Sequence, residues 1–186
     1  MIKIRTATKE DAEKLLEIYS WYVKNTAITF EWDVPDSEEF RCRIVTTLQK
    51  HPWLVAEENG ELLGYAYTGA FKGRQSYDWS AETSIYLKPE VRGRGLGQRL
   101  YEALEKVSRM QGITNLYACV ASPGRTDPWL DDSSMEFHAH MGYRLVGRFE
   151  KCASKFDRWY DMIWMEKHLS KHEEKPQAVI PFPELV

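Results

Sequence analysis

The sequence predicts one mixed α/β domain, with about seven mostly antiparallel strands and about four flanking helices. The first half contains two apolar runs, Trp53 to Glu57 and Leu62 to Tyr67, on either side of an Asn-Gly pair, which is a strong hairpin signal. Further on, a strand pattern at Ala81 to Leu87 leads through a glycine-rich loop into a helical pattern and then into another strand pattern. This order is typical of a parallel crossover, so the expected sheet is mixed.

The chain begins with a predicted strand and helix. Hydrophobic and charged residues alternate from Ile2 to Arg5, as in a half-buried strand. Thr8 and Asp11 form a capping-box pattern that opens a helix running to about Lys24. The segment from Asn25 to Pro35 has no helical period and reads as a loop with apolar anchors.

Two further helices are indicated by apolar residues at helical spacing. Ser37 is expected to cap the first of them. The other runs from Leu96 to about Val107, and Gly112 is placed to terminate it. Their apolar faces should be buried against the sheet.

The last third contains the remaining elements. Leu116 to Val120 reads as a strand, and a loop rich in Pro, Gly and Asp precedes a short helix near Ser133 to Met141. Two strands, roughly Tyr143 to Lys151 and Trp159 to Met165, complete the sheet. We therefore expect a domain over residues 1–169 and a tail over 170–186, extended over the surface or partly disordered.

Composition excludes several function classes. The 25 Lys and Arg against 28 Asp and Glu give a net charge of −3, which disfavours nucleic acid and anionic lipid as partners. Apolar runs fall short of the ~20 residues that span a membrane, and the first residues lack a signal-peptide core, so a cytoplasmic protein is expected. The three cysteines, Cys42, Cys119 and Cys152, are widely spaced and fit neither a disulfide framework nor a zinc cluster. No metal site is expected.

The glycine-rich loop from Val91 to Leu100 is a candidate anion site. It lies between a predicted strand and a predicted helix, where unpaired backbone N–H groups and the helix dipole favour a phosphate. An ordinary tight turn with a solvated basic rim is the alternative. A Walker loop is excluded because no Lys-Ser or Lys-Thr follows the glycines, and a dinucleotide fold would place its glycines after the first strand.

The pattern Arg92-x-x-Gly95-x-Gly97 resembles the pyrophosphate-binding signature of the GNAT superfamily, Arg/Gln-x-x-Gly-x-Gly/Ala. Three blocks around it, 51–57, 72–79 and 81–87, resemble the phosphinothricin and methionine sulfoximine acetyltransferase branch. The similarity runs from Ile2 to about Met165 and includes Gly142-Tyr143 and the segment 155–161.

This resemblance implies the GNAT acyl-CoA N-acyltransferase fold and acetyl transfer from acetyl-CoA. The acceptor would be the amine of a small amino-acid-like molecule of the phosphinothricin, methionine sulfoximine or methionine sulfone type. The amine would attack the thioester directly in a ternary complex, so no nucleophilic cysteine is required. The resemblance also leaves room for a homodimer.

The family pattern gives the residues their expected roles. Glu82 matches the family's general base, although it could be a solvated strand residue or the partner of an arginine. The pantetheine arm would pair with the main chain of the strand at Ile85, Tyr86 and Leu87. The expected pyrophosphate cradle comprises Arg92, Gly93, Arg94, Gly95, Leu96, Gly97 and Gln98.

The acceptor site is expected on the branch-specific loop, with Lys72, Arg74, Tyr77 and Trp79 as its candidate residues. Phe30, in the early loop, resembles the family's lid over the acceptor. A guanidinium suits a carboxylate, and aromatic rings can wall a small cavity. A basic aromatic surface loop with Trp79 packed in the core is the alternative.

The chain departs from the branch pattern around the short helix. Asp131 replaces an Asn that contacts the cofactor arm in relatives, and an ionised acid cannot donate that hydrogen bond. The Tyr that protonates the leaving thiolate in many relatives is missing from this helix, so His138, water or no specific acid remain open. The longer loop from Ser122 to Leu130 could reshape the acceptor pocket.

Two other functions remain to be weighed. The acceptor could be a protein N-terminus, a polyamine or an aminoglycoside, but these are cationic and Lys72 and Arg74 argue against them. Alternatively the domain binds coenzyme A without catalysis, because of Asp131 and the altered loop.

Overall fold

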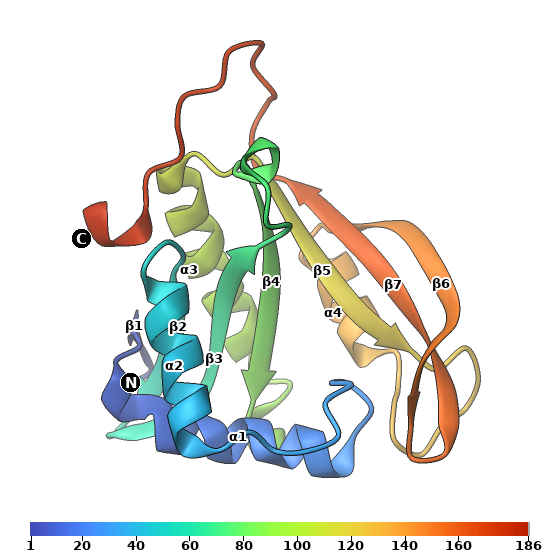
Figure 1. The fold of residues 1–186 in the computed structure, drawn as a ribbon. Coiled ribbons are helices and arrows are strands. Elements are labelled where there is room, and N and C mark those ends of the chain that lie inside the picture. The colour runs from blue at the N-terminus through green and yellow to red at the C-terminus, as the bar shows by residue number, and fades with distance from the viewer. Residues whose placement is uncertain (186) are drawn as a thin grey trace.

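The computed structural model describes residues 1–185 and contains one seven-stranded sheet in the order β1-β2-β3-β4-β5-β7-β6 (Figure 1). The strands are β1 (Lys3–Thr6), β2 (Trp53–Glu58), β3 (Glu61–Ala70), β4 (Ser80–Leu87), β5 (Asn115–Ser122), β6 (Arg144–Lys155) and β7 (Arg158–His168). The helices are α1 (Ala12–Asn25), α2 (Ser37–Leu48), α3 (Leu96–Gln111) and α4 (Ser133–His140). Only β4 and β5 pair in parallel, so the predicted mixed sheet is confirmed.

Local sequence signals account for most element boundaries. The capping box at the start of the first helix is present, with the Thr8 N–H donating to the Asp11 carboxylate at 2.8 Å. The β2–β3 turn places Asn59 at φ 52° and Gly60 at φ 80°, as a two-residue hairpin requires. The cap of α2 was predicted one residue late, because the carboxylate of Asp36 accepts the Glu39 N–H at 2.8 Å.

Helices cover both faces of the sheet. In Figure 1, α1 and α2 lie in front of the half formed by β1 to β4, while α3 lies behind the sheet. Leu15, Ile18, Phe40 and Ile44 of the front helices are buried against Trp53 and neighbouring sheet residues. Leu100 and Leu104 of α3 are fully buried against the opposite face. The front of β5, β6 and β7 lacks such a helical cover.

The feature that positions the site is the divergence of β4 and β5. These strands pair only at Ser80 to Glu82 with Asn115 to Tyr117, although both continue beyond that point. Figure 1 shows them separating toward the end of the sheet at which α1 lies, with the α1–α2 loop crossing the open end of the gap. Main-chain groups of both strands are therefore left without a strand partner.

The C-terminal segment after β7 is extended and anchored at its end. Gln111 Nε2 donates to the carbonyls of Lys50 at 2.7 Å and Ile180 at 3.0 Å, which ties the segment to α3 and to the end of α2. Phe182 is buried, with 3% of its surface exposed. The C-terminal segment is extended, as the sequence predicts, and the buried Phe182 anchors its end.

Within residues 1–185 no helix has both the length and the apolarity needed to cross a bilayer. The same residues contain no group of three or more His, Cys, Asp or Glu side chains placed to hold a metal ion. Cys42, Cys119 and Cys152 are unpaired and exposed.

Candidate active site

The glycine-rich loop forms a tight curl in front of α3. Gly93 and Gly95 adopt φ values of 75° and 72°, a left-handed conformation that glycine enters without steric cost. Because α3 begins directly at Leu96, the unpaired amides of its first turn join those of the loop. The Arg92 guanidinium lies 5.1 Å from the ring centroid of Tyr22 and adds positive charge. This combination favours an anionic ligand.

A cavity of about 370 Å³ adjoins this loop. Eight of the predicted cofactor residues line it: Ile85, Leu87, Arg92, Gly93, Gly95, Leu96, Gly97 and Gln98. Its other walls come from α1, the loop after α1 and α4, and were not predicted: Tyr22, Ile28, Ser133, Ser134, Phe137 and His140. The structure therefore brings together residues up to about 118 positions apart.

Three predicted cofactor residues lie outside this lining. The Arg94 guanidinium is 3.9 Å from the Glu58 carboxylate. Asp131 accepts hydrogen bonds from the N–H and hydroxyl of Ser133, which hold the pKa of its carboxyl below the usual range. Tyr86 lines a second, smaller cavity instead.

At the end of β4, some main-chain N–H and C=O groups already have hydrogen-bond partners. The Tyr22 hydroxyl donates to the Leu87 carbonyl at 2.6 Å and accepts the Leu87 N–H at 3.3 Å. The expected pairing of a ligand with the main chain at Ile85, Tyr86 and Leu87 stays a prediction, and at Leu87 the Tyr22 hydroxyl contacts both main-chain groups. Ile85 lies closer to the gap between β4 and β5.

The second cavity, of about 50 Å³, lies at the gap between β4 and β5. Thr83 and Ser84 contribute walls from β4, and Cys119 contributes one from β5. Three wall residues are shared with the larger cavity: Ile28, Ile85 and Ser134. The two cavities therefore adjoin, and together they extend from the glycine-rich loop to the point where the strands separate.

Glu82 lies at that point of separation, as the last β4 residue paired with β5. Because side chains alternate along a strand, Glu82 and Ser84 point to the front of the sheet and Thr83 points to the back. Partial burial raises the pKa of the Glu82 carboxyl, and the positive charge of Lys72 opposes the rise. A carboxylate with a raised pKa is suited to accept a proton near neutral pH.

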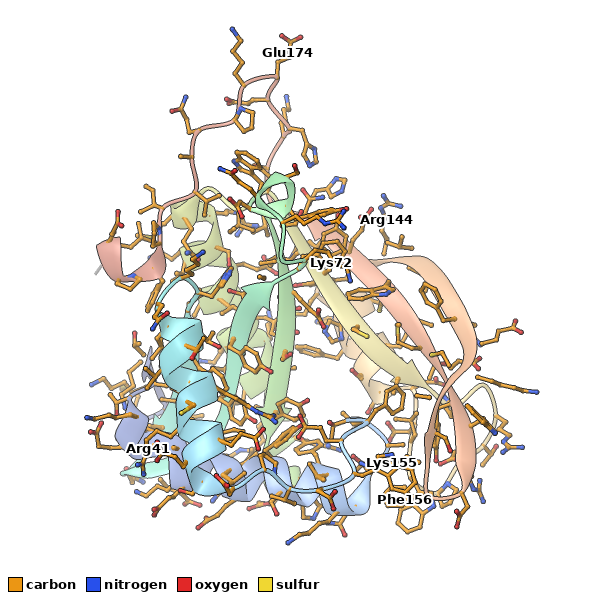
Figure 2. The ribbon with its side chains drawn as sticks, in the orientation of Figure 1. Arg41, Lys72, Arg144, Lys155, Phe156 and Glu174 are labelled. Atoms are coloured by element: carbon orange, nitrogen blue, oxygen red, sulfur yellow. The ribbon has the colours of Figure 1, made fainter. Side chains whose placement is uncertain are left out.

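The loop after β3 borders the front of the sheet near Glu82. The Lys72 ammonium lies 5.0 Å from the ring centroid of Phe71 and 5.5 Å from that of Trp164. Figure 2 shows Lys72 beside the upper part of β5. The Tyr77 ring packs edge-on against Phe71 at 5.9 Å, and Arg74 is exposed. Phe71 and Trp164 were not predicted as site residues.

The side chain of Trp79 contacts the C-terminal segment. Its indole N–H donates to the Gln177 carbonyl in the C-terminal segment at 2.8 Å. The expected place of Trp79 in the acceptor site stays a prediction, and its polar edge faces the tail.

The α1–α2 loop is fixed to the β6–β7 hairpin. The ring centroid of Phe30 lies 6.2 Å from that of Tyr160, and Lys155 Nζ donates to the Thr29 carbonyl at 2.8 Å. Figure 2 shows Lys155 where this loop approaches the hairpin. Only 2% of Lys155 is exposed, and this burial lowers its pKa to about 8. Phe30 is therefore held at the end of the gap.

A third hollow, of about 500 Å³, lies between α2 and the sheet. Its floor includes Trp53 and Tyr67, whose rings stack at 4.1 Å, and Tyr67 pairs with Ser84 in the sheet. The ion pair between Arg43 and Glu31, at 2.7 Å, lies at its wall. This hollow therefore borders the sheet face to which Glu82 points.

His138 lies on α4 in the wall of the smaller cavity and is 4% exposed. Its Nδ1 is 2.7 Å from the Ser134 carbonyl and its Nε2 is 2.9 Å from the Tyr101 hydroxyl. Burial lowers the pKa of the imidazole. Tyr101 was not predicted, although a hydroxyl between Leu100 and Leu104 on the buried stripe of α3 is a signal that it needs a polar partner.

Comparison with known proteins agrees with this geometry. Residues 4–164 match the model of the acetyltransferase (GNAT) domain. Phosphinothricin N-acetyltransferase of Streptomyces coelicolor is 30% identical over 182 residues, covering 90% of this chain and 96% of that protein. An L-methionine sulfoximine/L-methionine sulfone acetyltransferase of Pseudomonas paraeruginosa is 31% identical over 175 residues, covering 93% and 98%.

A solved structure is similar over nearly the whole chain. The crystal structure of a GNAT superfamily phosphinothricin acetyltransferase from Sinorhizobium meliloti in complex with acetyl-CoA superposes with a TM-score of 0.85 at 30% identity, covering 97% of this chain and 98% of that one. The chain belongs to the GNAT acetyltransferase family.

Proposed function

We propose that this protein transfers an acetyl group from acetyl-CoA to the amine of a small amino-acid-like acceptor. One observation carries the proposal: the cavity at the glycine-rich loop adjoins the cavity at the β4–β5 gap, where Glu82 is placed. The larger cavity, bordered by the glycine-rich loop, suits a long phosphorylated ligand. The smaller cavity has room for little more than a thioester head.

The glycine-rich loop would bind the coenzyme diphosphate. Gly93 and residues 95–98 line this end of the cavity, where the unpaired amides of the loop and of the first helical turn favour an anion, and Arg92 adds a guanidinium for a phosphate. The pantetheine arm would then follow the apolar walls formed by Ile85 and Phe137 toward the strand gap. Asp131 and Arg94 lie outside these walls and are not assigned to the arm.

Glu82 would remove a proton from the acceptor ammonium, directly or through a water. The free amine then attacks the thioester carbonyl and a C–N bond forms. The nitrogen of the tetrahedral intermediate loses its second proton to water, and the C–S bond breaks to release the thiolate. Cys119 takes no part as a nucleophile, because partial burial raises the pKa of its thiol to about 12 and keeps it protonated.

The acceptor would bind at the front of the sheet. Lys72 is the cation placed nearest Glu82 in the predicted loop, and it would receive the acceptor carboxylate. The hollow beside α2, with its aromatic floor, would receive the acceptor side chain. The relatives named for phosphinothricin and for methionine sulfoximine and sulfone support an acceptor of this class.

Thiol release from acetyl-CoA tests the proposal. Methionine sulfone, methionine sulfoximine and phosphinothricin would be compared with spermidine and an aminoglycoside, and we expect turnover with at least one of the first three only. Glu82→Gln should lower kcat/KM by about 10²-fold, the scale of one general base, while the exposed Glu13→Gln on α1 should not. Turnover confined to the cationic amines would refute the acceptor class.

We further propose that two copies associate through the β6–β7 hairpin. Four large apolar side chains of this hairpin have more than half of their surface exposed: Leu145, Val146, Phe149 and Trp159. Large apolar side chains exposed along one hairpin support a protein interface. Sedimentation should give the mass of two chains, and Trp159→Glu should shift it to that of one; a wild-type mass of one chain would refute the dimer.

We propose a reducing compartment, the cytoplasm, as the place of action. Three exposed, unpaired cysteines support it, because free thiols persist where disulfides are kept reduced. Fractionation of the source cells with an antibody against the protein tests this assignment.

A further inference from the structure

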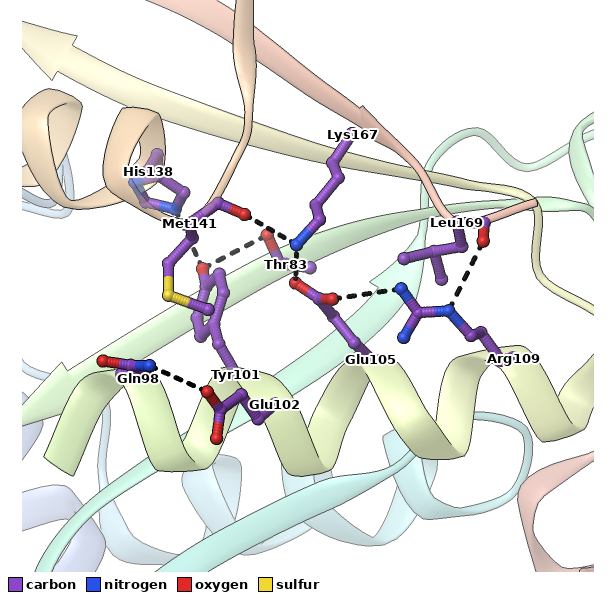
Figure 3. Close-up of polar contacts among 10 residues, drawn as sticks. All are labelled: Thr83, Gln98, Tyr101, Glu102, Glu105, Arg109, His138, Met141, Lys167 and Leu169. Atoms are coloured by element: carbon purple, nitrogen blue, oxygen red, sulfur yellow. Dashed lines mark hydrogen bonds and ion pairs between the residues drawn. The ribbon is translucent and has the colours of Figure 1, made fainter. Parts of the chain in front are cut away.

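A continuous chain of hydrogen bonds runs along the wall of the smaller cavity, and Figure 3 shows its central part, from His138 through Tyr101 to Thr83. It starts at the Ser134 carbonyl, which contacts His138 Nδ1 at 2.7 Å, and continues from His138 Nε2 to the Tyr101 hydroxyl at 2.9 Å. Tyr101 then contacts Thr83 Oγ1 at 3.2 Å, and Thr83 donates to the Tyr117 carbonyl at 3.1 Å. Four contacts thus connect α4, α3, β4 and β5.

Counting protons shows that four hydrogen bonds along this chain need one proton more than its neutral side chains carry. Each of the four contacts needs one proton, and the two carbonyls at the ends can only accept. Thr83 and Tyr101 each supply one proton, and a neutral imidazole supplies one, which makes three. An imidazolium at His138 supplies the fourth and satisfies every contact.

His138 has no N–H left to present to the cavity. Its Nδ1 is directed to Ser134 and its Nε2 to Tyr101, and only 4% of the residue is exposed. Tyr101 also lines the smaller cavity, and its hydroxyl is the next group along the chain. A proton that leaves His138 toward the cavity therefore has to pass through the Tyr101 oxygen.

We propose that Tyr101 donates the proton that the leaving thiolate of coenzyme A requires, and that His138 replaces that proton through Nε2. The inference rests on the proposed acetyl transfer, since only that reaction places a thiolate in the gap. The Tyr101 O–H turns from Thr83 to the sulfur, and its O–H bond breaks as the S–H bond forms, while the Nε2–H proton of the imidazolium moves to the Tyr101 oxygen. The products are the free thiol, an intact phenol and a neutral His138, which regains its proton from water after the coenzyme leaves.

The surroundings of the hydrogen-bond chain explain why the proton transfer from Tyr101 has to be coupled to the transfer from His138. Burial raises the pKa of the Tyr101 phenol, so a free phenolate would be costly. The nearby carboxylate of Glu105 on α3 is paired with Lys167 of β7 at 2.6 Å and with Arg109 at 3.3 Å (Figure 3). The remaining titratable neighbours are Cys119 of the cavity wall and Tyr143, whose ring centroid is 5.3 Å from that of His138.

Thr83 and Ser134 hold the chain in place but cannot supply the extra proton. His138 acts on the thiolate only through Tyr101, and it is therefore a positioning residue. Because burial lowers the pKa of His138, the imidazolium fraction falls as pH rises past that pKa, and kcat should fall with it.

Four variants test the relay: Tyr101→Phe, His138→Gln, the double variant, and Ser108→Ala as a matched control that removes another buried hydroxyl of α3, one with no hydrogen bond to the chain. We expect Tyr101→Phe and His138→Gln each to lower kcat by about 10²-fold, with the Kd for acetyl-CoA changed less than about twofold. The double variant should be no slower than Tyr101→Phe, because the two groups act in series. His138→Gln should also lose the fall of kcat at high pH, and Ser108→Ala should keep the wild-type kcat.

Each outcome has a distinct meaning. Wild-type kcat in Tyr101→Phe, or a full additional loss on adding His138→Gln to it, would overturn the relay while acetyl transfer by the wild type stands. Absence of turnover by the wild type with every acceptor would overturn the proposed function itself, and the relay with it. Calorimetry with acetyl-CoA on each variant separates a lost proton donor from a lost fold.

Discussion

A substitution at Gly97, in the first turn of α3, should weaken coenzyme binding and leave the stability of the protein almost unchanged. A Cβ at this position would lie 3.1 Å from Phe137 Cε2, 3.3 Å from Phe137 Cζ and 3.5 Å from Ile85 Cδ1. Ordinary contacts begin near 3.4 Å, so the Phe137 ring has to retreat by a few tenths of an ångström in Gly97→Ala. In the free protein this is inexpensive, because the ring borders a cavity of about 370 Å³. With acetyl-CoA bound, that space is taken.

Gly97→Ala should therefore weaken acetyl-CoA binding about tenfold, or about 1.4 kcal/mol, near the lower end of overpacking costs. The free energy of unfolding should change by less than about 1 kcal/mol, because alanine also favours the helix. Calorimetry gives the first value and urea denaturation the second. Gly73→Ala is the matched control, since its Cβ would meet nothing within 4 Å. Wild-type affinity in Gly97→Ala would refute this account of the cavity.

Two predictions concern stability. Desolvation lowers the pKa of Lys155 to about 8 from 10.5, so the unfolded chain binds more protons than the folded one between these pH values. The free energy of unfolding should therefore rise with pH across that window. Lys155→Met should remove this rise in urea denaturation, and identical pH profiles of the variant and the wild type would contradict the prediction. Phe182→Ala should lower the free energy of unfolding by about 3 kcal/mol, because it empties a buried site of the C-terminal segment. A loss below about 0.5 kcal/mol would mean that the segment contributes little to the fold.

The fold was predictable where local interactions decide the structure. The Asn59-Gly60 turn, the Thr8 capping box and the glycine that ends α3 each act within a few residues, and all three are observed. The cap of α2 was misplaced because Asp36 and Ser37 are both good N-cap residues, and only the observed backbone distinguishes them.

The site was predictable in part. Residues of the glycine-rich loop line the larger cavity because a contiguous segment builds that wall. The Tyr101–His138 contact joins residues 37 apart, and the contact of Trp79 with Gln177 joins residues 98 apart. Such contacts depend on how α3, α4 and the tail pack on the sheet, and no local pattern encodes them.

The central claim is that acetyl-CoA extends from the glycine-rich loop to the β4–β5 gap. A crystal structure of the protein with acetyl-CoA tests it most directly. We predict the diphosphate within hydrogen-bonding distance of the amides of residues 93–98 and the sulfur in the gap near Thr83 and Tyr101. A coenzyme bound elsewhere, or a diphosphate that makes no contact with these amides, would contradict the claim.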